Sequence, residues 1–388
     1  MDITLQPGKL RGNVTAIPSK SMAHRLLICA ALADKPTQLI CQGSSMDIDA
    51  TIACLQTLGA NIEKTGNGFS IFPISKPPVS AVLPCRESGS TLRFLLPIVG
   101  ALGIDATFLM EGRLPQRPLS PLWEEMERMG CMLSRPTANT VHCSGKLRPG
   151  AYRIDGSVSS QFISGLLFAL SLLPHSTLEI IGKAESKPYI AMTESCMALF
   201  HTPNHPSPDP IVVEGDWSNG AFWIAVGALD NQVSISGLNE DSLQGDRAIM
   251  ALLPQLCETN TTISAADIPD LIPILAVLAA AYHGATFTNI QRLRLKESDR
   301  VEAIAAMICA LGGIAHVHEN TLTIAGTGLQ GGTVDSFQDH RIAMSAAIAA
   351  TACKHPVTIL GAECVKKSYP TFWEEYELLG GRYVQFLR

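Results

Sequence analysis

A pattern that recurs six times along the chain constrains its fold more than any other feature of the sequence. Each copy begins with a polar or turn-like residue, continues as an apolar helical stretch, and ends in a segment rich in Ala or Leu. The copies are anchored, 52 to 70 residues apart, at Ser21, Ser90, Ser160, Ser218, Asp270 and His340. Internal repeats of this kind indicate a protein assembled from copies of one supersecondary unit.

Each apolar helical stretch is followed by a short β-like run and then by a second helical segment. The β-like runs read TQLIC, DATFLM, STLEII, QVSIS, ATFTNI and PVTIL. The second helical segment is clearest in DIDATIACLQTLGA, PLSPLWEEMERMGC, ESDRVEAIAAMICALGG and YPTFWEEYELLGG, and weaker around 189–200 and 242–256. Small polar residues at a helix start and Gly just beyond its end are common capping residues. The sequence therefore predicts an α/β protein of six repeated units.

The length of the chain favours more than one domain. With 388 residues, 46% of them hydrophobic and only 16% charged, there is ample material for two cores. Six repeats divide naturally into three and three, and the Pro-rich run at 201–210 offers a break between them. We therefore expect an N-terminal domain over 13–212 and a C-terminal domain over 213–388. Residues 1–12, with their strand-like ITLQP, are expected to join the second domain.

Charge and composition argue against several classes of protein. The formal net charge is −6 and no block of five or six like charges occurs, which disfavours a nucleic-acid partner. The longest nearly uncharged apolar stretches, 162–173 and 271–282, are too short to cross a bilayer. The eleven cysteines include no CxxC pair, and the first residues resemble neither a signal nor a transit peptide. We therefore expect a cytoplasmic protein with reduced cysteines and no membrane partner.

Basic residues gather where the repeated helical stretches begin. They are Lys20 and Arg25 at the first start, Arg93 at the second and Arg341 at the sixth, with Arg113, Arg117, Lys296, Arg300, Lys366 and Lys367 in nearby loops. Helix N-termini carry unsatisfied N–H groups and partial positive charge, so several of them together with these cations would bind anions. For any one of these residues, the alternative is an ordinary solvated surface charge.

Ten motifs follow one another along the chain: PSKSMAHR, ESGSTLRF, GRLPQRP, GSVSSQF, SKPYI, EGDWSNGAF, DIPD, LRLKESDR, QDHRIAM and KKSYPTF. In this order they resemble the 5-enolpyruvylshikimate-3-phosphate synthase family over essentially the whole chain. The resemblance implies a two-domain inside-out α/β barrel of six repeated α/β units, three per domain, with the active site in the cleft between the domains. It also implies transfer of the enolpyruvyl group of phosphoenolpyruvate to the 5-hydroxyl of shikimate 3-phosphate through a tetrahedral intermediate, with release of phosphate.

No metal or organic cofactor and no partner beyond the two anionic substrates is implied, and we expect a monomer. The family's shikimate 3-phosphate contacts fall on Lys20, Ser21, Arg25, Ser159, Ser160, Gln161, Ser186, Tyr189, Asp270 and Lys296. Its phosphoenolpyruvate contacts fall on Lys20, Gly89, Ser90, Arg117, Gln161, Arg300, Arg341 and Lys367. Hydroxyls and amides suit a polyol and its phosphate, and the arginine fork matches carboxylate and phosphate groups.

The reaction implied by the resemblance needs two opposed acid/base groups, because an alcohol loses a proton while a methylene gains one. Asp270 is the expected partner of the 5-hydroxyl, with Glu297 and Lys20 as proton donors or relays on the other side. The plainer interpretations are a helix cap for Asp270 and an exposed salt bridge with Arg300 for Glu297. His340 is expected to orient its neighbours.

Five positions depart from the commonest pattern of the family, namely Glu87, Gln116, Trp217, Arg292 and Gln338. They leave open whether Glu87, Arg292 and Gln338 contact the substrate. Two other functions also remain as alternatives. One is the enolpyruvyl transferase that acts on UDP-N-acetylglucosamine, whose hallmark is a reactive Cys in the loop corresponding to GRLPQRP; residues 111–120 contain no Cys. The other is a non-catalytic anion-binding repeat protein.

Overall fold

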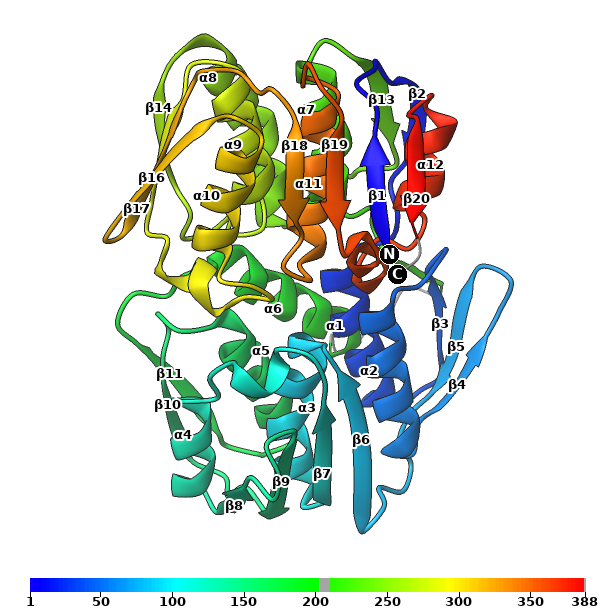
Figure 1. Ribbon diagram of the computed structural model, residues 1–388. Coiled ribbons are helices and arrows are strands. Elements are labelled where there is room, and N and C mark those ends of the chain that lie inside the picture. Colours follow the sequence, from blue (N-terminus) through cyan, green and yellow to red (C-terminus); the bar gives the residue numbers. More distant parts are fainter. Residues whose placement is uncertain (202–209, 387–388) are drawn as a thin grey trace. The chain divides into compact units, whose positions relative to one another are not determined.

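The computed structural model describes residues 1–201 and 210–386 (Figure 1). Most of the Pro-rich run that the sequence offers as a domain break therefore lies outside the described residues. The chain divides into two compact units: unit 1 comprises Met1–Ile17 and Gly215–Arg388, and unit 2 comprises Pro18–Glu214. Buried hydrophobic side chains form one large cluster within each unit. Each unit therefore has a hydrophobic core of its own.

Unit 2 contains the first three copies of the repeat. Its helices are α1 (Lys20–Ala31), α2 (Met46–Thr57), α3 (Gly89–Leu102), η1 (Leu114–Gln116), α4 (Leu122–Arg128), α5 (Ser160–Leu170) and α6 (Lys187–His201). Its strands are β3 (Thr37–Ile40), β4 (Asn61–Lys64), β5 (Gly68–Phe72), β6 (Ser80–Arg86), β7 (Asp105–Met110), β8 (Cys131–Ser134), β9 (Thr140–Gly145), β10 (Ala151–Asp155), β11 (Thr177–Ile181) and β12 (Ile211–Val212). Among the described residues they form sheets of order β12-β3-β5-β4, β6-β7-β9-β8 and β10-β11.

Unit 1 contains the other three copies and the N-terminal segment. Its helices are α7 (Trp217–Ala228), η2 (Gly245–Ala248), α8 (Ile249–Glu258), α9 (Ile272–Ala281), η3 (Gln291–Leu295), α10 (Arg300–Ala310), α11 (His340–Ala350), η4 (Ala362–Lys367) and α12 (Phe372–Leu378). Its strands are β1 (Asp2–Leu5), β2 (Arg11–Thr15), β13 (Gln232–Ser236), β14 (Thr261–Ser264), β15 (Ala285–Thr288), β16 (Ile314–His318), β17 (Thr321–Ala325), β18 (Gly332–Asp335), β19 (Val357–Leu360) and β20 (Tyr383–Phe386). In the part described, the sheet orders are β18-β19-β1-β20, β14-β15-β17-β16 and β13-β2.

The apolar stretches of the repeat are the helices α1, α3, α5, α7, α9 and α11, which confirms the predicted α/β content. Each is followed by a strand, in turn β3, β7, β11, β13, β15 and β19, and later by a second helix. These helices lie inside their units: α3 packs against α5, α9 packs against α7 and α11, and the strands pack on them. Every residue from Ile272 to Ala280 of α9 is buried, which explains why this helix is apolar on all sides.

Two predicted boundaries differ from those observed. The N-terminal segment belongs to unit 1 up to Ile17, beyond the expected boundary at residue 12, because β2 pairs in parallel with β13 along its whole length. The helix expected to open at Asp270 begins at Ile272, with Leu271 as its N-cap. Pro273 fits this start because the first turn of a helix does not need the N–H that proline lacks.

Within the described residues, no helix combines the length and the apolar character that spanning a membrane requires. All eleven cysteines are free. Most of them are buried, but Cys309 is exposed and Cys257 is half-buried.

Candidate active site

Unit 2 presents three repeat helices whose N-termini have neutral caps. Ser19, Ser88 and Ser159 cap α1, α3 and α5, and each side chain accepts a hydrogen bond from a backbone N–H in the first turn. None of these three first turns contains an acidic residue. Because an Asp or Glu there would offset the positive end of the helix dipole, the three N-termini keep their preference for anions.

Lys20, the first residue of α1, is held beside a carboxylate. Its Nζ lies 2.9 Å from Oδ2 of Asp47, and both side chains are only 16% exposed. Asp47 lies in the first turn of α2 and was not a sequence candidate, since nothing in its local pattern distinguishes it from a favourable acidic residue at a helix start. The Lys20 ammonium is therefore held in a largely buried ion pair at the start of α1.

Arg25 of α1 is 2% exposed and donates hydrogen bonds to residues of α1 and α6. Its Nε donates to Thr193 Oγ1 at 2.8 Å, Nη1 donates to the Ser21 carbonyl oxygen at 2.8 Å, and Nη2 donates to the Tyr189 carbonyl oxygen at 2.9 Å. Burial lowers the pKa of Arg25 to about 10, which still leaves it charged at neutral pH. The structure thus gives Arg25 a role in holding α1 against α6, and its contact with a substrate stays a prediction.

The side-chain amide of Gln161 is oriented by Arg93. Arg93 Nη1 donates to Gln161 Oε1 at 2.6 Å, and Gln161 Nε2 donates to Ser90 Oγ at 2.9 Å. Since a guanidinium can only donate, the carbonyl end of the amide must face Arg93. Ser90 accepts the bond from Gln161, so its hydroxyl hydrogen can be donated to an anion. Arg93 was noted beside a helix start but was not among the predicted contacts.

Arg117 lies against the N-terminus of α3 because residue 89 is glycine. A Cβ at Gly89 would lie 2.7 Å from Arg117 Nη1, closer than atoms approach without a clash. The Arg117 side chain is 7% exposed and follows η1 directly. The structure therefore brings together three residues predicted for one anion, Gly89, Ser90 and Arg117.

The remaining predicted residues of unit 2 lie where α5 and α6 begin. Ser159 and Ser160, at the start of α5, are 7% and 4% exposed. Ser186 is 1% exposed, has a positive φ of 55°, and accepts a hydrogen bond from the Tyr189 backbone N–H at 3.0 Å. Tyr189 is half-buried in the first turn of α6. Two of these residues therefore lie at the start of the repeat helix α5, and the other two at the start of the second helix α6.

In unit 1, one buried guanidinium holds three carboxylates. Arg300 is 1% exposed, and its nitrogens donate to Asp270 at 2.5 Å, to Glu297 at 2.7 Å and to Asp339 at 2.8 Å. The two carboxylates predicted to act as acid and base are thus brought to the same side chain. The expected exposed salt bridge between Glu297 and Arg300 is wrong in one respect: the arginine is buried, because α10 packs against α9 and α11.

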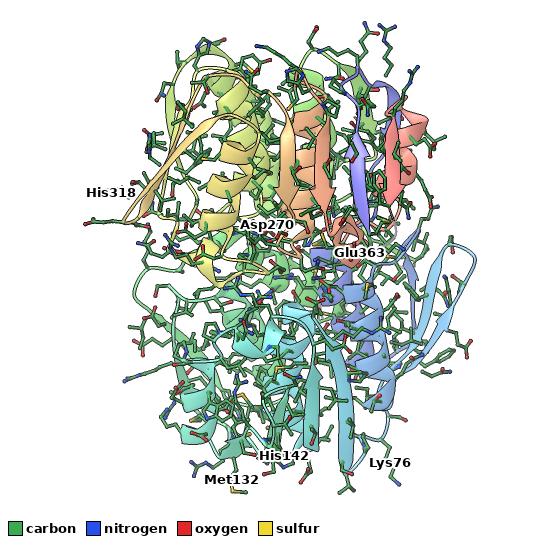
Figure 2. All side chains as sticks on the ribbon, viewed as in Figure 1. Lys76, Met132, His142, Asp270, His318 and Glu363 are labelled. Atoms are coloured by element: carbon green, nitrogen blue, oxygen red, sulfur yellow. The ribbon has the colours of Figure 1, made fainter. Side chains whose placement is uncertain are left out.

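Asp270, which is labelled in Figure 2, lies among three cations. Besides Arg300, its carboxylate is 3.3 Å from Arg341 Nη2 and 3.5 Å from Lys296 Nζ. Burial alone raises the pKa of this carboxyl group, but Arg341, Lys296 and Arg300 outweigh burial and hold the pKa well below its usual value. Asp270 is therefore ionised at neutral pH. Its carboxylate takes part in these ion pairs and does not cap α9, whose N-cap is Leu271.

The side chain of Lys296 is 20% exposed, and the pKa of its ammonium group is lowered. Burial lowers the pKa of Lys296 to about 8, although the attraction of Asp270 acts in the opposite direction. Its ammonium therefore loses charge within the pH range in which enzymes are commonly assayed. A lysine of this kind can both bind an anion and exchange a proton.

The N-terminus of α11 carries the remaining predicted residues of unit 1. Asp339 caps this helix by accepting from the Arg341 N–H at 3.0 Å, and it also accepts from Ser298 Oγ at 3.0 Å. His340, the first residue of α11, is 2% exposed. Lys367, at the end of η4, donates to the Gln338 carbonyl oxygen at 2.8 Å. Asp339 is a residue that the sequence prediction missed, although an Asp just before a helical stretch is a common N-cap.

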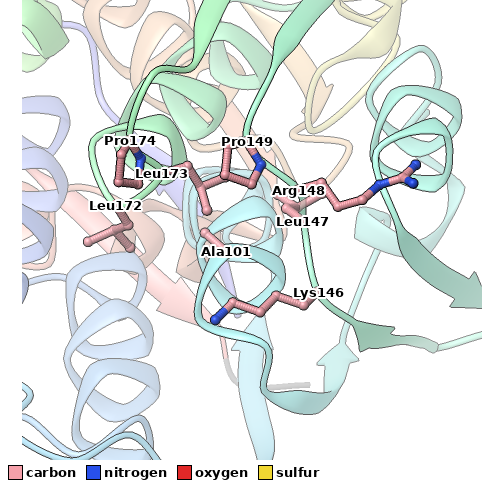
Figure 3. A pocket seen from close by; sticks show the side chains of 8 residues that line it. All are labelled: Ala101, Lys146, Leu147, Arg148, Pro149, Leu172, Leu173 and Pro174. Carbon is pink, nitrogen blue, oxygen red and sulfur yellow. The ribbon is translucent and has the colours of Figure 1, made fainter.

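The hollow drawn in Figure 3 is a separate feature of unit 2. It has a volume of about 400 Å³ and is lined by Ala101, Lys146, Leu147, Arg148, Pro149, Leu172, Leu173 and Pro174. Arg148 reaches away from it, and its Nη2 donates to the Arg128 carbonyl oxygen at 3.1 Å. None of the predicted contact residues lines this hollow. Among the described residues, no group of three or more His, Cys, Asp or Glu side chains is arranged to hold a metal ion.

Comparison with known proteins agrees with the motifs. A family model described as EPSP synthase (3-phosphoshikimate 1-carboxyvinyltransferase) matches residues 5–376. The 3-phosphoshikimate 1-carboxyvinyltransferase of Clostridium kluyveri is 40% identical over 418 residues, covering 98% of this chain and 97% of the relative.

Two solved structures show that the fold is shared. The EPSP synthase from Acinetobacter baumannii has a TM-score of 0.78 at 23% identity and covers 99% of this chain and 100% of its own. The enolpyruvyl transferase NikO from Streptomyces tendae has a TM-score of 0.74 at 17% identity, with 99% and 98% covered. In both comparisons the structural similarity extends over essentially the whole of this chain, and therefore over both of its units.

Proposed function

The chain belongs to the EPSP synthase family, and on that premise we propose that it transfers the enolpyruvyl group of phosphoenolpyruvate to the 5-hydroxyl of shikimate 3-phosphate, releasing phosphate. This activity is that of a 3-phosphoshikimate 1-carboxyvinyltransferase of aromatic amino acid biosynthesis. The observation that carries the proposal is the match of the family over residues 5–376, joined to the clustering of the quoted motifs at helix N-termini and buried cations. The UDP-N-acetylglucosamine enzyme and the non-catalytic alternative are not favoured.

Both substrates carry a phosphate and a carboxylate, so the site must supply cations and hydrogen-bond donors. In unit 2, Arg117 and Ser90 lie at the N-terminus of α3, which suits the phosphate of phosphoenolpyruvate. In unit 1, Arg341, Lys296 and Lys367 are the cations proposed for the anionic groups of the two substrates. Enolpyruvyl transfer needs both substrates, so the proposal assigns residues of each unit to substrate binding.

The reaction requires a C–O bond to form and a second C–O bond to break. The oxygen of the 5-hydroxyl attacks the enol carbon of phosphoenolpyruvate, its proton leaves, and the methylene carbon takes up a proton to give a tetrahedral intermediate. Loss of phosphate and of a proton from the new methyl group then restores the double bond. We assign the hydroxyl proton to Asp270, and the proton of the methylene carbon to Glu297 with Lys20 as the relay.

The ion pairs of Asp270 bear on its role as a base. A carboxylate whose pKa is held far below its usual value is a weak base. Anions that draw Arg341 and Lys296 toward themselves would loosen that hold and raise the pKa of Asp270. Substrate binding would thus convert an ion-paired carboxylate into one able to take the proton of the hydroxyl group.

The overall assignment is tested by phosphate release. Purified protein mixed with shikimate 3-phosphate and phosphoenolpyruvate is expected to release inorganic phosphate, and either substrate alone should release none. Replacing shikimate 3-phosphate with UDP-N-acetylglucosamine provides the control for the alternative transferase. Release with the sugar nucleotide, or none with the expected pair, would contradict the proposal.

Gly89→Ala tests the proposed phosphoenolpyruvate contacts. The new methyl group would displace the Arg117 guanidinium, which is the flexible end of its side chain, so the melting temperature should change little. Loss of a charge-assisted contact costs about 1.5 to 3 kcal/mol, so the KM for phosphoenolpyruvate should rise roughly tenfold or more. Arg117→Ala gives the limiting effect, and the KM for shikimate 3-phosphate is the internal control. An unchanged KM for phosphoenolpyruvate in both variants would remove Arg117 from the site.

The finer architecture is also part of the proposal. We propose that the three repeats of each unit form an inside-out α/β barrel, which is supported by the buried repeat helices and by the sheets that pack on them. A cytoplasmic location is supported by the eleven free cysteines. The monomeric state stays a prediction, which light scattering after gel filtration can check.

A further inference from the structure

Asp246 is a buried carboxyl group next to the candidate site that the proposed reaction does not use. It is the second residue of η2 and is 0% exposed. Its Oδ2 accepts a hydrogen bond from Ser218 Oγ. Its Oδ1 is buried and has no hydrogen-bond partner within the described part of the chain. A buried carboxylate with so few partners is costly to ionise, so its surroundings favour the protonated form.

Hydrogen bonds connect Asp246 to the base proposed for the reaction. Ser218, which binds Asp246 through its side chain, accepts a hydrogen bond from Arg341 Nη1 through its backbone carbonyl oxygen at 3.2 Å. Nη2 of the same arginine donates to Asp270 Oδ2 at 3.3 Å. These hydrogen bonds therefore form one continuous network, which runs from Asp246 through Ser218 and Arg341 to Asp270. The network lies entirely within unit 1.

Several charged groups face Asp246 from the surrounding elements. Burial has the largest effect and raises the pKa of Asp246; Asp270, before α9, raises it further, as does Asp216, the N-cap of α7. Arg341 of α11 and the hydrogen bond from Ser218 lower it, and together these influences bring the pKa to about 7. On η2 itself, Arg247 is exposed and donates to the Glu240 carbonyl oxygen.

We propose that Asp246 is a positioning residue whose proton decides how Arg341 is shared between Asp270 and a bound anion. The proposal rests on the proposed function, because it identifies the anion as phosphoenolpyruvate. While Asp246 holds its proton, Arg341 is available to the substrate. When the proton is lost, the new negative charge attracts Arg341 and repels both Asp270 and the incoming anion.

The direction of the pH effect follows from these charges. As the pH rises through about 7, Asp246 ionises and the affinity for phosphoenolpyruvate falls. Lys296, with a pKa of about 8, also loses charge in alkaline solution, and the phosphate group of the substrate titrates as well. Only a comparison between variants that share Lys296 and the substrate isolates the contribution of Asp246.

The kinetic test measures the KM for phosphoenolpyruvate across about pH 6 to 8.5 for the wild type and Asp246→Asn. Asn resembles the protonated carboxyl group in shape, so kcat at the acidic end should be similar in both proteins. The wild-type KM should rise on the order of fivefold relative to that of the variant as the pH increases. Asp241→Asn, an exposed change in the same loop, is the matched control and should follow the wild type. Parallel KM profiles for wild type and Asp246→Asn would overturn the proposal.

Ser218→Ala provides a second variant that keeps the carboxyl group. It removes the hydrogen bond that lowers the pKa of Asp246, so the rise in KM should move to higher pH. A merely structural role for Asp246 predicts weaker binding at every pH with no displacement of the profile. A profile that keeps its midpoint in Ser218→Ala would therefore count against the network.

A measurement that does not depend on turnover separates this proposal from the proposed function. Asp246 has a folded pKa above its unfolded value, so folding takes up a proton and the wild type loses stability as the pH rises from about 4 to about 7. Asp246→Asn lacks this loss, and its melting temperature relative to the wild type should increase over that range. Inorganic phosphate should raise the melting temperature of the wild type, relative to the variant, more at about pH 6 than at pH 8.5. If the melting-temperature differences between the wild type and Asp246→Asn do not depend on pH, the proposal is overturned. This outcome can be read even if the protein releases no phosphate from the two substrates.

Discussion

Replacing Asp270 with Asn is expected to lower turnover on the order of 10²- to 10⁴-fold, the usual contribution of a positioned acid/base group. Asn keeps the shape of the side chain but cannot accept the hydroxyl proton. Because Arg341, Lys296 and Arg300 hold the pKa of Asp270 low against the effect of burial, its charge stabilises the folded protein at neutral pH. The variant should therefore also melt earlier. Turnover is measured by phosphate release well below that melting temperature, with shikimate 3-phosphate binding followed alongside.

The companion change Glu297→Gln should reduce turnover by a similar factor through a different proton. It should also slow the exchange of solvent hydrogen into the methylene group of phosphoenolpyruvate. Glu302→Gln is the matched control, since Glu302 lies in the first turn of α10, a few residues after Glu297, is 62% exposed and pairs with Arg294 at 2.9 Å. Near-normal turnover in either site variant would leave that residue as an ion-pair partner of Arg300 and nothing more.

The starts of the repeat helices could be predicted from the sequence because the signals are local. A polar cap followed by an apolar stretch identifies α1, α3, α5 and α11 within a residue or two. The start of α9 was placed too early, because Asp270 resembles an N-cap. In the folded chain its carboxylate is attracted to cations that come from α10, α11 and the turn before α10. The tendency of Asp to act as a helix N-cap is therefore outweighed at this position by ion pairs with residues distant in the sequence.

The residues that the sequence prediction missed are those whose partners lie far along the chain. Asp47 is recognisable as a site residue only because the fold places α2 beside Lys20. Thr193 is recognisable only because the fold places α6 beside Arg25. Asp246 is likewise ordinary in sequence, and its burial beside Ser218 depends on the packing of η2 against α7. A single sequence contains no pattern for such pairs, because their spacing is set by the fold.

The resemblance to the family assigned residues to substrates, whereas the structure shows what each of them already binds. Arg25 and Arg300 were both assigned to substrates, but in the structure both donate hydrogen bonds to the protein itself. Arg25 donates to hydroxyl and carbonyl oxygens, and Arg300 donates to carboxylates. Arg117 lies against the N-terminus of α3, beside Gly89 and among neutral first-turn residues. We therefore expect Arg117 variants to change ligand affinity, and Arg300 variants to change the fold of unit 1 first.

Arg300→Met is expected to be among the most destabilising single changes in unit 1. The guanidinium is 1% exposed and is the shared partner of Asp270, Glu297 and Asp339, so its removal leaves three carboxylates facing one another. Removing one partner of a buried ion pair costs about 3 to 5 kcal/mol, because the remaining charge stays desolvated. The free energy of unfolding, measured in urea at neutral pH, should fall by at least this order.

The pH dependence of that loss identifies its cause. Burial raises the pKa of Asp339 and of Asp270, and Arg300 is among the cations that reverse the effect in both. Without Arg300 the two pKa values rise, so the carboxyl groups take up protons as the pH falls and the repulsion between them disappears. The stability of the variant should therefore approach that of the wild type on acidification below neutral pH. Arg382→Met, an exposed change in the same unit, is the control and should show neither the loss nor its pH dependence. A stability difference that stays constant with pH would mean that Arg300 acts through packing alone.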